Sequence, residues 1–450
     1  MSDFNYEILF SILMLSLLVL GTSMAKSLVL TGILFIGLFY FIIGDFSDWH
    51  MNMWSFNNWK YFIKVLLLII TLKIWFLLDR KDINNSVLLL FVLVGSILLI
   101  SCEHLLLIYL ALELQTFSLF VLIAKNRNSM LSTEAGLKYF ILGAISSGIF
   151  LLGVSIIYGI SLSMSLKDIA FINQDNFILI VAQSLILIAL LFKLTAVPFH
   201  MWAPDVYEGA STEIVALIAT VPKVSVLIVL MNLNFPSDLL LLAAVFSMVF
   251  GTLGALNQNK IKRLIAYSGI SHMGFILLGI ALFNIYGQEA SFVYLLIYLF
   301  MIIATFSIIL ISPMKNYLII ELSGVIKNNK TVGLTWAILL LSIGGIPPLA
   351  GFISKWLLLW TSLNNAFYVG SLIGILCSMV AGAYYLRIVK IVYFQKTSNF
   401  IVWENLLNKD IVINESLALI LGISIYMVLF LIINPNPWVL FSHWGVVSLF

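Results

Sequence analysis

The sequence predicts an all-α polytopic membrane protein, and two observations carry that prediction. Hydrophobic residues make up 62% of the 450 positions and charged residues only 10%, with a mean hydropathy of +1.13. Soluble domains carry about 25% charged residues, so this composition is typical of a chain that lies mostly in lipid. Apolar runs of roughly 20 residues, the length that a bilayer crossing needs, also recur from end to end.

About fourteen transmembrane helices result when the apolar runs are divided into single crossings. The polar residues Glu103 and His104 divide one run that is too long for a single helix, and the segment 344–348, Gly-Gly-Ile-Pro-Pro, must break another. The helices are expected near residues 7–25, 27–44, 60–78, 86–101, 104–124, 134–160, 177–202, 213–233, 238–256, 262–284, 290–312, 332–363, 367–394 and 415–433.

The basic residues in the loops and at the loop-side ends of these helices gather on one side of the membrane. Cytoplasmic or matrix loops carry an excess of Lys and Arg, so both termini are expected to face outward. The outer side holds only Lys60, Lys64 and Lys167. The inner side holds fourteen basic residues: Lys26, Arg80, Lys81, Lys125, Arg127, Lys260, Lys262, Arg263, Lys315, Lys327, Lys330, Lys390, Lys396 and Lys409.

Two units of five helices, residues 85–236 and 237–398, are predicted to be inverted repeats of one another. Three transmembrane helices precede them in residues 1–84, and a C-terminal helix and tail follow in residues 399–450. The fourth helix of each unit is broken by proline and carries one lysine. Because five is an odd number of crossings, the units run in opposite directions, as in many transporters whose sites lie at the membrane midplane.

The most informative part of the chain is the polar exit of the seventh helix. Lys193 lies inside an apolar run, and Pro198 interrupts that run. Proline removes a backbone N–H, and an opened helix beside a charged amine is tolerated in lipid only against neighbouring protein or a water-filled cavity. Lys193 is therefore a candidate functional residue, and Lys355, near Pro347 and Pro348, is its counterpart in the second unit.

Three further ionisable residues are expected deep in the membrane. Lys223 has about half a membrane of apolar residues on each side, so its amine cannot easily reach the interface, unlike those of Lys73 and Arg387 near helix ends. Glu113 is the one carboxylate well inside a predicted helix, and Lys138 on the next helix is its predicted partner. The pair is either a structural salt bridge that fixes helix packing or a charge pair that opens and closes during transport.

Two histidines and two acids complete the set of candidate residues. His200 and His272 are candidate proton carriers, because imidazole titrates near neutral pH. A hydrogen-bonded structural histidine is the alternative for each. Asp205 and Glu208 follow the first break and are expected to anchor the polar segment there.

Several classes of function lack any support in the sequence. There is no dinucleotide-binding glycine loop, P-loop, haem-type histidine pair, or nucleophile with a nearby base, so we expect no redox, hydrolytic or metal site. Cys102 and Cys377 lie far apart in apolar stretches, which favours a packing role. A net charge of +3 without a basic cluster indicates no nucleic-acid binding. The acidic N-terminus is unlike an Arg-rich presequence.

The polar exit of the seventh helix reads Lys-x-x-x-x-Pro-Phe-His-x-Trp-x-Pro-Asp over Lys193–Asp205 and continues as Val-Tyr-Glu-Gly-Ala. Other motifs are Leu-Glu-Leu-Gln around Glu113, Leu-Lys-Tyr-Phe at Lys138, Val-Pro-Lys at Lys223, the segment 261–274, and Gly-Ile-Pro-Pro-Leu-Ala-Gly-Phe-x-x-Lys ending at Lys355. Through these motifs the chain resembles the antiporter-like membrane-arm subunits of respiratory NADH:ubiquinone oxidoreductase, complex I, and in particular their subunit 2 branch.

The resemblance implies a proton-translocating subunit that couples NADH oxidation by quinone to proton pumping. Glu113 and Lys138 would match the family's charge-transmitting pair, Lys193 and Lys223 its central lysines, and Lys355 its terminal lysine. NADH, FMN, the iron–sulfur clusters and ubiquinone would bind to other subunits. The implied partners are other membrane-arm subunits, both antiporter-like and small ones, together with membrane lipids.

Two other functions remain open. One is an Mrp-type sodium/proton antiporter subunit, which shares the same core, and the other is a purely structural subunit whose buried charges hold helices together. A composition rich in Ile, Phe and Leu, without a presequence, predicts an organelle-encoded protein of the mitochondrial inner membrane. A bacterial plasma membrane or a thylakoid is the alternative location.

Overall fold

The computed structural model describes residues 49–51, 54–56, 58–77, 83–170, 177–233, 235–312, 314, 316–323, 329–395 and 415–447. The helices predicted near 7–25 and 27–44 lie outside these described residues, as do the predicted inner-side residues Lys327 and Lys409. Over the described part, the chain divides into two compact units. The division separates the two halves of the first broken helix, because residues 195–216 belong to the second unit.

Unit 1 comprises residues 1–194 and 217–236. It opens with a small antiparallel hairpin in which Trp49 is opposite Phe56, a feature that the all-α prediction did not include. Its elements are β1 (Trp49–Met51), β2 (Trp54–Phe56), α3 (Asn58–Leu77), α4 (Ile83–Ser101), α5 (Leu105–Ile123), α6 (Met130–Ser161), α7 (Leu166–Ala170), α8 (Phe177–Lys193) and most of α10 (Thr212–Asn232).

Unit 2 comprises residues 195–216 and 237–448. Its elements are α9 (Trp202–Gly209), α11 (Ser237–Leu256), α12 (Ile261–Ala281), α13 (Ile285–Ile311), the 3-10 helix η1 (Ile319–Leu322), α15 (Lys330–Gly344), α16 (Ala350–Asn364), α17 (Tyr368–Phe394), α19 (Glu415–Ile433) and α20 (Asn436–Val447). The short helices α7, η1 and α20 were not predicted.

The described helices confirm the polytopic membrane fold. Seven continuous helices among the described residues are long and apolar enough to cross a bilayer, and the bent pair formed by α19 and α20 could provide an eighth crossing. The predicted division of the long run at Glu103 is confirmed, since α4 ends at Ser101 and α5 begins at Leu105. The seven continuous helices are α5, α6, α10, α11, α12, α13 and α17.

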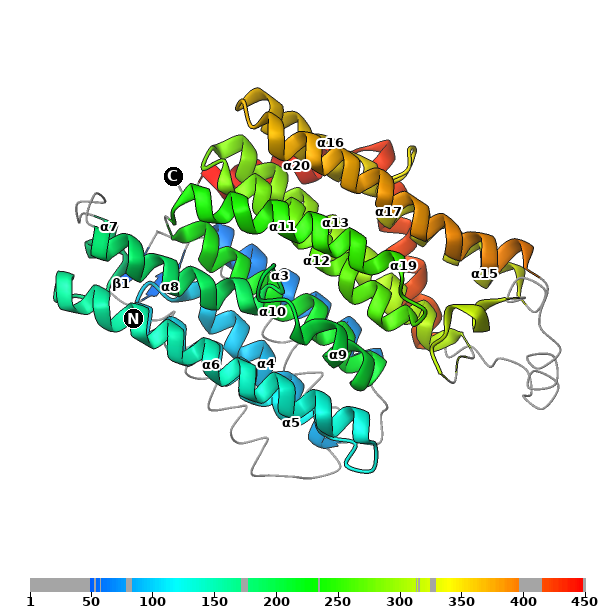
Figure 1. Cartoon of the computed structure of the whole chain (residues 1–450), viewed down its shortest axis with the longest axis horizontal. Helices are drawn as coiled ribbons and strands as arrows, with labels where there is room; N and C mark the ends of the chain where they lie inside the picture. Colours follow the sequence, from blue (N-terminus) through cyan, green and yellow to red (C-terminus); the bar gives the residue numbers. More distant parts are fainter. Residues whose placement is uncertain are drawn as a thin grey trace. The chain divides into compact units, whose positions relative to one another are not determined.

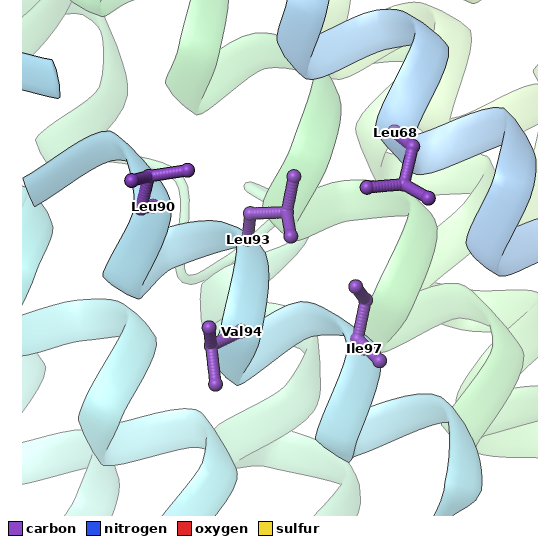
Figure 2. Packing of buried hydrophobic residues seen from close by; sticks show 5 residues of the cluster. All are labelled: Leu68, Leu90, Leu93, Val94 and Ile97. Carbon is purple, nitrogen blue, oxygen red and sulfur yellow. The ribbon is translucent and has the colours of Figure 1, made fainter. Parts of the chain in front are cut away.

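Unit 1 is held together by apolar packing between neighbouring helices. Figure 2 shows Leu68 of α3 beside Leu90, Leu93, Val94 and Ile97 of α4, and none of these side chains is more than 5% exposed. The spacing of three and four residues along α4 places its four members on one helix face. Further along the chain, α6 and α8 pack side by side (Figure 1).

In unit 2, α12 and α13 are buried along most of their length. Helices α11, α13, α16 and α17 all pack against α12. The approach of α11 is close at Gly251, where a β-carbon would lie 2.6 Å from the backbone nitrogen of Ser271. Small residues permit such contacts between membrane helices.

Both proline-broken helices are confirmed as breaks. The first ends at Lys193 and the chain resumes helical structure at Trp202, while the second ends at Gly344 and resumes at Ala350. Each half-helix end leaves backbone carbonyls without helical partners. The two breaks therefore place polar backbone groups within otherwise apolar segments.

Candidate functional site

Lys193 is the last residue of α8, and its side chain is 9% exposed. A cation at this position is favoured because the carbonyl end of a helix carries partial negative charge. The amine lies 5.7 Å from the centre of the Phe192 ring, and the carboxylate of Glu113 is within Coulombic range of it. Lys193 thus lies buried at the end of α8, in the same unit as Glu113.

Lys223 lies in the middle of α10 and is 1% exposed. The residue before it, Pro222, lacks an N–H, so the helix loses one of its internal hydrogen bonds beside the lysine. The hydroxyl of Ser225 bonds to the Pro222 carbonyl at 3.0 Å, and Gln115 of α5 donates to the same hydroxyl at 3.3 Å. The predicted deep burial of this lysine is confirmed.

Glu113 is half-buried, and its carboxylate accepts a hydrogen bond of 3.3 Å from Thr116 on the next turn of α5. The ion pair described for Lys138 is with Glu134, one turn earlier on α6, at 2.7 Å. Both side chains of that pair are exposed, at 41% and 57%. The predicted pairing of Glu113 with Lys138 therefore stays a prediction.

In unit 2, Lys355 of α16 binds the C-terminal end of α15, across the second helix break. Its amine donates to the carbonyls of Gly344, at 2.8 Å, and Ile343, at 3.4 Å, which are at the C-terminus of α15. The side chain is 5% exposed. Gly345 makes this contact possible, because its φ of +78° suits glycine and a β-carbon there would lie 2.8 Å from Lys355 Cδ.

A series of aromatic contacts runs from Lys355 to His272. The lysine amine lies 5.7 Å from the Phe275 ring, which stacks on Tyr294 with 5.9 Å between ring centres. The Tyr294 hydroxyl is 2.7 Å from His272 Nδ1. The Tyr298 ring centre lies 5.5 Å from that of His272. His272 is 3% exposed and hydrogen-bonded, so this geometry is compatible with both roles considered for it.

His200 and the two acids after it occupy the first break. His200 is 7% exposed, in the turn that leads into α9. Asp205 accepts a hydrogen bond of 2.7 Å from Arg263 Nη2, and Glu208 forms ion pairs with Arg263 and Lys260. The predicted anchoring role of Asp205 and Glu208 is thus confirmed in unit 2.

Ionic contacts at other places were not predicted. Glu103 lies between Lys60, at 3.6 Å, and Lys167, at 3.5 Å. Glu289 of α13 pairs with His443 of α20. Hydropathy and loop position mark such residues only as interfacial charges, because their partners are distant in sequence. In the part of the chain that the structure describes, no group of three or more His, Cys, Asp or Glu side chains is placed to hold a metal ion.

Comparisons with known proteins place this geometry in a family. The family described as NADH:quinone oxidoreductase/Mrp antiporter, TM, matches residues 102–381, which include every candidate ionisable residue. The NADH-ubiquinone oxidoreductase chain 2 of Metridium senile is 47% identical over 376 residues, or 81% of this chain and 97% of that protein. The NADH-quinone oxidoreductase subunit N of Parvibaculum lavamentivorans is 36% identical over 88% of this chain and 85% of that protein.

The fold also matches a solved respiratory complex. A chain of respiratory complex I from Thermus thermophilus superposes with a TM-score of 0.85 and 26% identity, covering 96% of this chain and 98% of that one. The likeness in sequence and the likeness in fold therefore both extend over most of the length. The chain belongs to the NADH:quinone oxidoreductase/Mrp antiporter family, in the branch that comprises NADH-ubiquinone oxidoreductase chain 2 and NADH-quinone oxidoreductase subunit N.

Proposed function

We propose that this chain is a proton-translocating membrane-arm subunit of NADH:quinone oxidoreductase, complex I. The observation that carries the proposal is a set of buried ionisable groups in apolar helices of both units. Unit 1 holds Lys193 and Lys223, and unit 2 holds Lys355 and His272, each less than 10% exposed. Buried charges are costly in membranes and mark ion pathways. The chain would act enzymatically as part of the translocase, with no redox site of its own.

Electrostatic repulsion between lysines provides a mechanism. Burial disfavours the ammonium form of a lysine, so a proton on Lys223 is held weakly. Arrival of positive charge at Lys193 would expel that proton, and departure of the charge would let Lys223 reload. Glu113, which acts electrostatically on Lys193, would tune the first step. Lys138, Lys355, His200 and His272 are proposed as the other members of the pathway.

Fourteen transmembrane helices in two inverted five-helix repeats form the proposed architecture, with the domain boundaries at 84, 236 and 398. A repeated backbone pattern supports it. In each five-helix repeat, the link before the second helix (α5 or α12) pairs antiparallel with the segment after the third helix (α6 or α13). The four hydrogen bonds are Leu105 N to Met164 O at 3.0 Å, Leu166 N to Glu103 O at 2.9 Å, Ile261 N to Tyr317 O at 2.9 Å, and Ile319 N to Asn259 O at 3.0 Å.

The two breaks repeat a second feature. Each half-helix is followed by a residue with left-handed backbone, Thr195 with φ of 62° and Gly345 with φ of 78°. Each of these residues precedes a proline by three positions, Pro198 in the first case and Pro348 in the second. Matching conformations at matching positions support a common ancestry of the two units.

The partners proposed for this chain are other complex I membrane-arm subunits. The face of α5 that carries Glu113 also carries Leu110 and Phe117, which are 52% and 55% exposed. A carboxylate on an apolar, outward-facing helix stripe is unfavourable against lipid, so a neighbouring subunit is expected to cover it. NADH, FMN, iron–sulfur clusters and ubiquinone would bind in other subunits. The proposed location is the mitochondrial inner membrane, with the bacterial plasma membrane as the alternative.

A single preparation tests the proposal. Native membranes would be solubilised, and the proteins that comigrate with this chain identified, while sealed vesicles are assayed for proton uptake driven by NADH. We expect comigration with NADH-oxidising subunits and proton uptake that is independent of sodium. Comigration with Mrp subunits, together with sodium-driven proton exchange, would instead favour the antiporter.

A further inference from the structure

We infer that three basic residues at the start of α12 position α9, the short helix after the first break, and so hold the break in its working geometry. These residues are Lys260, Lys262 and Arg263. We call them, together with Asp205, Glu208 and the Ala210 carbonyl, the α9 latch. Its importance for proton transfer rests on the proposed function, whereas its mechanical role does not.

The acidic side chains of α9 form one half of the latch. Arg263 contacts both Asp205 and Glu208, and Lys260 contacts Glu208. Glu208 is only 14% exposed in these pairs, and a shielded carboxylate shared by two cations is held more firmly than a solvated one. Arg263 can serve two acids at once because its guanidinium presents several donors in a fixed geometry.

The C-terminal end of α9 forms the other half. Lys262 is 3% exposed. It donates a hydrogen bond of 2.8 Å to the carbonyl of Ala210, the C-cap residue directly after α9. Carbonyls at this end of a helix lack intrahelical partners and carry partial negative charge, so a lysine there is doubly favoured. The same amine lies 4.0 Å from the centre of the Tyr317 ring, a cation–π contact.

Backbone hydrogen bonds to the start of α12 hold Tyr317 in place. Its carbonyl accepts from Ile261 N at 2.9 Å, at the first residue of α12, and Ile319 N donates to Asn259 O. Burial raises the pKa of the Tyr317 hydroxyl, so the ring that covers Lys262 stays neutral at physiological pH. The lysine is thus enclosed between α9, α12 and the segment before η1.

The latch matters because α9 has little stability of its own. It contains eight residues, Trp202–Gly209, and helices shorter than about 12 residues are marginal without tertiary contacts. The turn before it contains Pro198 and His200, so a shift of α9 displaces both. The contacts with α12 therefore determine where the polar groups of the break lie.

A charge-swap cycle tests the latch. Asp205→Arg, Arg263→Asp and the double variant would be made in the assembled complex, with Cys102 and Cys377 replaced by alanine and a reporter Met201→Cys. Met201 is 73% exposed and precedes α9 directly. We expect each single reversal to change the rate of maleimide labelling at position 201 several-fold. The double variant should restore it only in part, because the carboxylate introduced at position 263 still faces Glu208. Proton yield per NADH should fall and recover in parallel.

Variants of Lys262 provide a second test of the latch, and a variant of Lys330 is the matched control. Lys262→Arg keeps a cation that can reach the Ala210 carbonyl and the Tyr317 ring, so it should rescue both readouts, whereas Lys262→Met should not. Lys330→Glu reverses an exposed charge at the start of α15, outside the latch, and should change neither. Asp205→Asn and Arg263→Gln would replace any charge reversal that fails to assemble.

The two readouts separate the two claims. Unchanged labelling at position 201 in every single variant would overturn the latch. Altered labelling with an unchanged proton yield would overturn its role in proton transfer. A complex that pumps no protons even without these substitutions would contradict the proposed function, while the labelling result would still decide whether the latch positions α9.

Discussion

In the first broken helix, α8 ends at Lys193, and the chain turns through Thr195 before Pro198. In the second, α15 ends at Gly344, and the chain turns through Gly345 before Pro348. The lysines occupy different sequence positions. Lys193 precedes its proline by five residues, and Lys355 follows its proline by seven.

Both lysines are nevertheless associated with the C-terminal end of the first half-helix. Lys193 is part of that end, while Lys355 reaches back to it from α16 and binds the carbonyls of Gly344 and Ile343. The electrostatic reason is the same in both cases, since the carbonyl end of a helix attracts a cation. The comparison teaches that both breaks place a lysine near the carbonyl end of a helix, although the two lysines come from different sequence positions.

The largest effect is expected at Lys223, which, unlike Lys193 and Lys355, lies in an unbroken helix. We expect Lys223→Arg and Lys223→Met to reduce the proton yield per NADH to background, because neither side chain can release a proton at accessible pH. The measurement is NADH-driven proton uptake by sealed vesicles containing the assembled complex. Lys125→Arg, in an exposed loop, is the control. A near-normal yield from Lys223→Arg would eliminate Lys223 as a relay.

Glu113 tests whether unit 1 depends on a changing charge. We expect Glu113→Gln to slow coupled turnover several-fold with the complex still assembled, because glutamine keeps the volume and loses the charge. A purely structural role predicts a different result. Removing one member of a buried pair costs about 3 to 5 kcal/mol, so the amount of assembled complex on native gels would fall instead.

Gly345 tests the close contact in the second break. We expect Gly345→Ala to destabilise the subunit by about 2 kcal/mol, of which roughly half comes from the left-handed backbone and half from displacing the Lys355 amine. Gly344→Ala is the matched control, because a β-carbon there would meet nothing closer than Tyr385, at an ordinary 3.5 Å. The temperature at which the complex dissociates would measure both effects. Equal stability of the two variants would contradict the role given to Gly345.

Thr195 tests the same position in the first break, with the smallest effect. A β-branched residue with φ of 62° is strained, and the Thr195 hydroxyl is buried without a hydrogen-bond partner among the described residues. We therefore expect Thr195→Gly to leave stability unchanged or raise it by about 1 kcal/mol. Thermal dissociation of the complex is again the measurement, and a clear loss of stability would show that the hydroxyl has a role of its own.

The breaks and the buried lysines could be predicted because their signals are local. Pro198 and Pro348 disrupt hydrogen bonding wherever they occur in a helix, and Lys193, Lys223 and Lys355 have long apolar flanks. Helix α20 was missed because its twelve residues are too short to be recognised as a crossing.

Contacts across the fold could not be predicted in the same way. Lys355 binds backbone carbonyls, which no sequence motif identifies. Lys262 was classed only as a loop cation, because its partner Ala210 lies 52 positions earlier. Lys138 was predicted to pair with Glu113 of the preceding helix, whereas the structure pairs it with Glu134 on its own helix, four residues away.

Glu103 and its two lysines have a consequence for the biogenesis of the protein. On the predicted topology, Lys60 and Lys64 in the first turns of α3 and Lys167 in α7 are the basic residues that must be carried to the outer side during membrane insertion. An elementary charge moved against a potential of 100 mV costs about 2.3 kcal/mol. Glu103 and Lys60 lie at the same end of the α3–α4 hairpin and contact each other. If they cross as a pair, Glu103 reduces the net charge that this hairpin carries across, with Lys64 included, from +2 to +1, which would lower the barrier to its insertion.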